Sequence, residues 1–153
     1  MEHPKNLIIV IFGASGDLAS RKLIPAIYSL SCQNMMPEKY AILGVGRSKI
    51  EPEQFRIKMK EAILSFSEEK IDETSQLTAF TENLFYVSMD DYAAKDEIAW
   101  PVATSLKDIE GKYGIDGNYV FYMATPPSLY EIIAHSIAKS GLSIQDDGFR
   151  RFM

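Results

Sequence analysis

The stretch LIIVIFGASGDLA, residues 7–19, decides the fold of this 153-residue chain. Its first half, Leu7–Phe12, is a continuous apolar run rich in β-branched residues. Such a run is typical of a strand that is buried on both faces of a parallel sheet. The glycine-rich second half, residues 13–19, predicts a tight turn from that strand into a helix that begins near Asp17.

A glycine-rich turn between a buried strand and a helix can bind the phosphates of a dinucleotide. Small residues let the backbone approach the pyrophosphate, and the free amides and dipole of the helix end attract its charge. The spacing is G-x-x-G-x-x-A, and Ala19 stands where close helix–strand packing needs a small side chain. The same glycines also suit a plain tight turn, but their position after the strand favours phosphate binding. Asp17 is expected to cap the helix or complement its dipole, without a catalytic role.

Strand-like and helix-like periods alternate along the rest of the chain. Polar residues 67–81 are expected to form a surface insertion with one short helix, and Pro101 to break or kink a longer helix. Further strands are expected at 41–45, 84–87, 119–124 and 149–153, and helices at 55–66, 93–113 and 129–137. This alternation predicts right-handed βαβ units and therefore an α/β, Rossmann-like, doubly wound parallel sheet in a single three-layer domain.

Composition excludes several classes of function. A net charge of −5 and 46% hydrophobic residues indicate a globular protein that binds neither nucleic acid nor anionic membranes in general. Cys32 is the single cysteine, so no disulfide can form within the chain, and His3 and His135 offer little for a metal site. No signal peptide or membrane span is evident, and a cytoplasmic location is expected.

The end of the second strand indicates which dinucleotide would bind. NAD-binding folds usually carry an acidic residue there, about 20 residues after the glycines, to bind the ribose hydroxyls. This chain has Arg47 and Ser48 instead. A guanidinium can hold the 2′-phosphate of NADP in a bidentate contact, and the serine adds a hydroxyl. We therefore expect NADP, although Arg47 could also be a solvated surface residue.

Other candidates lie near the same edge of the predicted sheet. Thr125 and Pro126 follow the fourth strand at its carboxyl end, and Tyr130 follows on the next helix. Lys22 lies on the first helix and, taken alone, would be read as a solvated lysine. The group around Thr125 could likewise be an ordinary strand-to-helix connection.

Three ordered blocks together resemble the glucose-6-phosphate dehydrogenase family. Residues 13–19 with Arg21-Lys22-Leu23-Ile24-Pro25 resemble its opening motif, GVGRS at 44–48 its second cofactor loop, and PPSLYE at 126–131 its third. The resemblance implies oxidation of glucose 6-phosphate to the lactone by hydride transfer to NADP, in the oxidative pentose phosphate pathway. It also implies a homo-oligomeric parent protein.

The resemblance assigns cofactor contacts residue by residue. They are Gly13, Ala14, Ser15, Gly16, Asp17, Leu18, Ala19 and Lys22 around the phosphates, Arg47 and Ser48 at the 2′-phosphate, Ser88 and Met89 beside the adenine, and Thr125, Pro126 and Tyr130. The family's Glu-Lys-Pro-Phe-Gly segment, catalytic histidine and aspartate have no match in residues 1–153. We therefore expect a dinucleotide-binding domain, truncated or proteolysed inside its last strand, without the catalytic β+α domain. His135 is not expected to act as the base.

Two alternatives stay open at this point. A short-chain dehydrogenase or epimerase uses a similar loop, but it needs a Tyr-x-x-x-Lys pair, and Tyr92 and Lys95 are only three residues apart. A nucleotide-sensing module without chemistry is compatible with everything inside the chain. Its expected incomplete last strand argues against it, because a free-standing sensor should complete its sheet.

Overall fold

The computed structural model describes residues 5–67, 74–95, 99–115, 117–144 and 148–153, so His3 lies outside the described part. Strands and helices alternate along the chain as the apolar period predicts. The strands are β1 (Leu7–Phe12), β2 (Tyr40–Gly46), β3 (Leu84–Ser88), β4 (Tyr119–Met123) and β5 (Arg150–Phe152). The helices are a π-helical turn η1 (Ala19–Leu23), α1 (Ile24–Cys32), α2 (Pro52–Phe66), α3 (Ser75–Glu82), α4 (Pro101–Tyr113), a 3₁₀ turn η2 (Pro127–Leu129) and α5 (Tyr130–Lys139).

The described strands form one parallel sheet in the order β3-β2-β1-β4-β5. β1 is central and pairs with β2 through Ile9↔Ile42 and with β4 through Ile9↔Val120. The order reverses between β1 and β4, which are not consecutive in the chain. The predicted parallel sheet, with the first and second strands adjacent, is confirmed.

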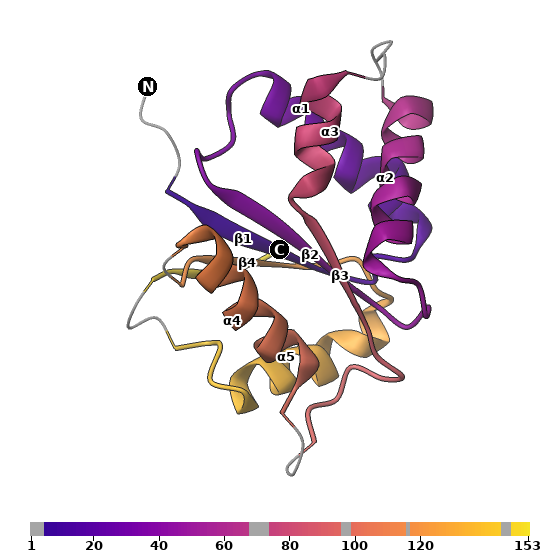
Figure 1. Cartoon of the computed structure of the whole chain (residues 1–153). Helices are drawn as coiled ribbons and strands as arrows, with labels where there is room; N and C mark the ends of the chain where they lie inside the picture. The colour runs from indigo at the N-terminus through magenta and orange to yellow at the C-terminus, as the bar shows by residue number, and fades with distance from the viewer. Residues whose placement is uncertain (1–4, 68–73, 96–98, 116, 145–147) are drawn as a thin grey trace.

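Helices cover both faces of the sheet (Figure 1). α1, α2 and α3 pack on one face, against Ile11 and Ile42 among others, and α4 and α5 pack on the other, against Val10 and Phe12. Successive side chains of a strand point to opposite faces, so both sets of positions in β1 must be apolar. Each fully buried side chain of this size contributes about 1.5–3 kcal/mol to folding.

The break expected at Pro101 in the helix over 93–113 is confirmed, whereas the helix expected over 93–95 was wrong. α4 begins at Pro101, and Trp100 before it is extended, with φ −66° and ψ 123°. A proline disfavours the helical region for the residue before it and suits the first helical position. Residues 93–95 are therefore irregular, and Gly114, with φ +66°, ends the helix. The short helix expected within 67–81 is α3, while residues 68–73 lie outside the described part.

The first helix has a widened turn near its start. The N–H of Ile24 donates to the carbonyl of Ala19, which is a π-type bond across five residues. Pro25, which has no N–H to donate, follows directly and lies in the first turn of α1. The wider turn thus connects the glycine-rich loop to a helix that contains a proline.

Candidate cofactor site

A cavity of about 450 Å³ opens where the strand order reverses, at the carboxyl ends of β1 and β4. Ligands of open α/β sheets bind at such a switch point. The predicted site residues that line it are Gly13, Ser15, Gly16, Arg47, Ser48, Thr125 and Pro126. Residues from loops after β1, β2 and β4, far apart in the sequence, therefore share one wall.

The glycine-rich loop, residues 13–16, turns sharply at the end of β1. Gly13 has φ +84°, a conformation that side chains with a Cβ rarely adopt. Its N–H and that of Ala14 both donate to the Val45 carbonyl, at 2.8 and 3.0 Å, which fixes the loop against β2. A helix begins at Asp17, and the first N–H groups of a helix have no acceptor within it and can bind an anion. The N–H of Ser20 already donates to the Gly16 carbonyl at 3.5 Å.

Two glycines of β2 make room for this loop. A Cβ on Gly44 would lie 2.9 Å from the Cβ of Ala14, and a Cβ on Gly46 would lie 2.8 Å from the Ser15 hydroxyl oxygen. Larger side chains at these two positions would therefore push the loop off the strand. Sequence reasoning assigned Gly44 and Gly46 only to a motif, because the contact joins segments about 30 residues apart.

The loop after β2 presents one cation and one hydroxyl to the cavity. Arg47 and Ser48 are both exposed and line it. The next residue, Lys49, forms an exposed ion pair at 3.9 Å with Asp90. The end of β2 itself carries no carboxylate. This arrangement suits an anionic group on the ligand.

Ser88 and Met89 line a neighbouring cavity of about 350 Å³ and not the cavity at the switch point. Lys49 and Trp100 line the same hollow. The Met89 N–H donates to the Gly46 carbonyl at 2.9 Å, which holds this segment beside the loop after β2. The structure therefore places Ser88 and Met89 next to the site rather than in its wall.

The remaining predicted residues also divide into those that line the cavity and those that do not. Thr125 is buried, and its hydroxyl oxygen has no hydrogen-bond partner in the described part of the chain. Tyr130 is 41% exposed, and neither it nor the exposed Lys22 lines the cavity. Ala19 is fully buried, as its small side chain predicts. Asp17 and Leu18 are exposed.

Tyr92 lines the cavity, although sequence reasoning gave it no site role. It is 4% exposed, and its ring meets Phe12 edge to face at 6.0 Å. Burial raises the pKa of Tyr92, while the charge of Arg47 and a hydrogen bond with the Gly13 backbone lower it. The hydroxyl therefore lies close to both predicted phosphate-binding segments. A single tyrosine in an irregular segment offers no pattern that could have revealed this.

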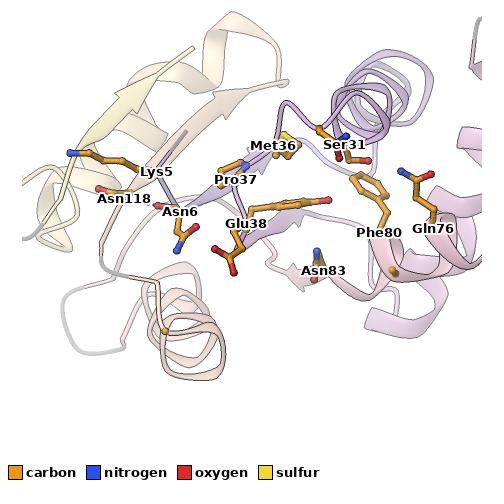
Figure 2. Close-up of a pocket in the computed structure, with 14 residues that line it drawn as sticks. Lys5, Asn6, Ser31, Met36, Pro37, Glu38, Gln76, Phe80, Asn83 and Asn118 are labelled. Carbon is orange, nitrogen blue, oxygen red and sulfur yellow. Dashed lines mark hydrogen bonds between the residues drawn. The ribbon is translucent and has the colours of Figure 1, made fainter. Parts of the chain in front are cut away.

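A cavity of about 890 Å³ lies at the opposite edge of the sheet (Figure 2). Lys5, Asn6 and Asn118 lie at one end of it and Phe80 and Gln76 at the other. It adjoins the amino ends of the strands, whereas the glycine loop lies at their carboxyl ends. Parallel sheets bind ligands at the carboxyl edge, so the smaller cavity is the candidate site.

Other chemistries find little support in the described residues. His135 is exposed on α5. The described residues contain no cluster of three metal-ligating side chains. Among them, no helix combines the length and apolar character needed to cross a membrane.

A parallel sheet of order 3-2-1-4-5 with a glycine loop at its switch point defines a dinucleotide-binding domain of the Rossmann type. The family model described as "Glucose-6-phosphate dehydrogenase, NAD binding domain" matches residues 10–153. The chain belongs to this family. The match favours the predicted resemblance over a short-chain dehydrogenase.

Several curated and solved proteins are similar to the chain. Glucose-6-phosphate 1-dehydrogenase of Treponema pallidum is 39% identical over 145 residues, covering 94% of this chain and 28% of the relative. The Leuconostoc mesenteroides protein of the same name is 30% identical, with 95% and 29% covered. A solved structure described as "Glucose-6-phosphate dehydrogenase in complex with its substrate glucose-6-phosphate" supports the fold, with a TM-score of 0.80 at 24% identity, covering 99% of this chain and 30% of that one.

Proposed function

We propose that this chain binds NADP and presents it as the hydride acceptor for the oxidation of glucose 6-phosphate to 6-phosphogluconolactone. The carrying observation is the switch-point cavity, whose wall combines the glycine loop 13–16 with Arg47 and no carboxylate at the end of β2. The chain spans 28% of the Treponema pallidum relative, so the reaction would need further protein. That step belongs to the oxidative pentose phosphate pathway.

The residues of the cavity fit a dinucleotide phosphate. The sharp turn at Gly13 and the small side chains of the loop let a ligand approach the backbone. Thr125 offers a buried hydroxyl without a partner in the described residues, and a ligand could satisfy it. In this proposal the helical turn at Asp17 binds the pyrophosphate, and Arg47 and Ser48 bind the 2′-phosphate.

Bound NADP would supply a nicotinamide ring that takes a hydride from the sugar. The residues of this chain hold and orient that cofactor. We propose that the base and the sugar-binding groups lie in the part of the relatives that this chain does not match, in a β+α domain. This proposal gives His135 no role as the base, because it is exposed on α5 and does not line the cavity.

Residues outside the cavity wall take secondary positions in this proposal. Ser88 and Met89, which line the neighbouring hollow, would lie beside the adenine. Lys22 and Tyr130 would approach the cofactor from outside the cavity wall. We also propose a homo-oligomeric, cytoplasmic parent protein, on the strength of the family.

The test is an equilibrium titration of the 153-residue chain with NADP and with NAD. Trp100 is the single tryptophan and lines the neighbouring hollow together with Lys49, so its fluorescence offers a local signal. One charge-assisted contact contributes about 1.5–3 kcal/mol, so NADP should bind about tenfold more tightly or better. Equal affinities would overturn the choice of NADP, and no binding of either would overturn the site.

A further inference from the structure

Tyr86, on β3, connects two of the cofactor loops from behind the cavity. Its hydroxyl donates a hydrogen bond of 2.7 Å to the carbonyl oxygen of Ser48. Burial raises the pKa of the same hydroxyl, and the neighbouring side chain of Ser15 lowers it. Ser15 belongs to the glycine loop and Ser48 to the loop that carries Arg47. One phenol group thus bridges the two segments proposed to bind the pyrophosphate and the 2′-phosphate.

The absent side chain of Gly46 creates the space for this bridge. A Cβ at position 46 would lie 2.6 Å from the Tyr86 hydroxyl and 2.8 Å from the Ser15 hydroxyl oxygen. Those two oxygens therefore meet directly over Gly46. The residue needs no special backbone conformation there, so its lack of a side chain is the property that the bridge requires.

The hydrogens of the bridge can be assigned from its geometry. Burial raises the pKa of Tyr86, so the phenol keeps its hydrogen near neutral pH. That single hydrogen is donated to the Ser48 carbonyl, so in any hydrogen bond between the two hydroxyls Ser15 is the donor and Tyr86 the acceptor.

The Tyr86 ring is itself fixed, which makes the bridge a rigid reference. Tyr86 is 7% exposed, and its ring centroid lies 4.9 Å from that of the buried Phe55. A ring held in this way sets the position of the Ser48 carbonyl, and hence of the adjoining Arg47.

We infer that Tyr86 is a positioning residue for cofactor choice, which holds the Arg47–Ser48 loop at a fixed place relative to the glycine loop. This inference rests on the proposed function, in which Arg47 binds the 2′-phosphate. NAD lacks that phosphate, so displacement of the Arg47–Ser48 loop should affect NADP far more than NAD.

The test is the substitution Tyr86→Phe, which keeps the ring against Phe55 and removes only the bridging hydroxyl. NADP affinity should fall about three- to tenfold and NAD affinity less than twofold. Gly46→Ala should instead weaken NADP and NAD alike, because its Cβ would displace Ser15 of the glycine loop as well as the Tyr86 hydroxyl. Tyr113→Phe is the matched control: its hydroxyl donates to Asn83 at 2.9 Å, away from the site, and both affinities should stay unchanged.

Hydrogen exchange of residues 47–49 in the free chain supplies an independent reading. Tyr86→Phe should speed exchange there, and Tyr113→Phe should not. A native chain that prefers NADP, with a Tyr86→Phe variant of the same preference, would overturn the inference and leave the proposed function intact. A native chain that binds NADP and NAD equally would overturn both the choice of NADP and the role of Tyr86 in selectivity. Hydrogen exchange would then test the Tyr86 bridge by itself. Faster exchange at residues 47–49 in Tyr86→Phe would support the bridge, and unchanged exchange would reject it.

Discussion

The carbonyl oxygen of Ala124 lies 2.6 Å from the point that a Cβ atom on Gly13 would occupy. The backbone segments that directly follow β1 and β4 are thus in contact at the switch point. This contact closes the floor of the candidate site and leaves no room for a side chain.

Gly13→Ala should therefore destabilise the fold more than backbone strain alone. A left-handed conformation costs an alanine about 1–2 kcal/mol, and the contact with Ala124 should add about 1–3 kcal/mol. Gly141 is the matched control, because it has φ +77° but nothing within 4 Å of its Cβ position. Urea unfolding of both alanine variants measures the difference, and equal losses would show that the contact with Ala124 yields without cost.

Arg47→Ala should weaken NADP binding about tenfold or more and change NAD binding little. The reason is that only NADP carries the 2′-phosphate proposed to meet the guanidinium. Arg47→Lys keeps the charge but loses the bidentate contact, and it should give an intermediate loss. Lys107→Ala on α4 removes a cation remote from the cavity and serves as the control. Calorimetric titration of each variant decides the matter, and equal losses for both dinucleotides would remove Arg47 from the role.

Thr125→Val should change stability and affinity in opposite directions. The hydroxyl of Thr125 is buried without a partner in the described residues, which costs the free protein about 1–3 kcal/mol. Its removal should raise the free energy of unfolding by about 1 kcal/mol and weaken cofactor binding. Thr81→Val is the control at the same 8% exposure, since its hydroxyl donates to the Thr78 carbonyl at 2.9 Å and its loss should not stabilise. A less stable Thr125→Val protein would contradict the argument.

The sequence predicted those parts of the fold that depend on local periodicity. The apolar run before Gly13 identified β1 and its burial on both faces, and the turn after it fixed the edge at which the site lies. The helix over 93–113 was read too long, because the apolar residues before Pro101 belong to an irregular segment packed against the sheet.

The site was predictable only where neighbouring residues carry it. Arg47 and Ser48 directly follow a strand, so their edge of the sheet could be predicted from their position. Tyr86 lies on β3 and Tyr92 in the segment after it, and both contact the loops that line the cavity. These contacts depend on how the strands pair. The spacing of residues in a single sequence does not predict which hydroxyl group will contact which loop across paired strands.

The 153-residue chain alone should not oxidise glucose 6-phosphate. Removal of the sugar's hydroxyl proton by a base contributes about 10²–10⁴-fold to such a reaction. Orientation of sugar against nicotinamide contributes about 7–11 kcal/mol more. We expect neither contribution from the described residues, since His135 is exposed on α5 and the cavity wall consists of the loops proposed to bind the cofactor.

The assay is NADPH formation from NADP and glucose 6-phosphate, with the full-length Treponema pallidum relative as the positive control. The purified chain should show no turnover above background while still binding NADP, because the glycine loop and Arg47 are present. Binding without turnover would be the signature of a cofactor domain that needs a partner domain for chemistry. Two findings together would contradict the proposal. They are turnover that scales with the amount of this chain, and turnover that persists in the Arg47→Ala variant with its lowered NADP affinity. Such results would place a catalytic base within residues 1–153 and not in a second domain.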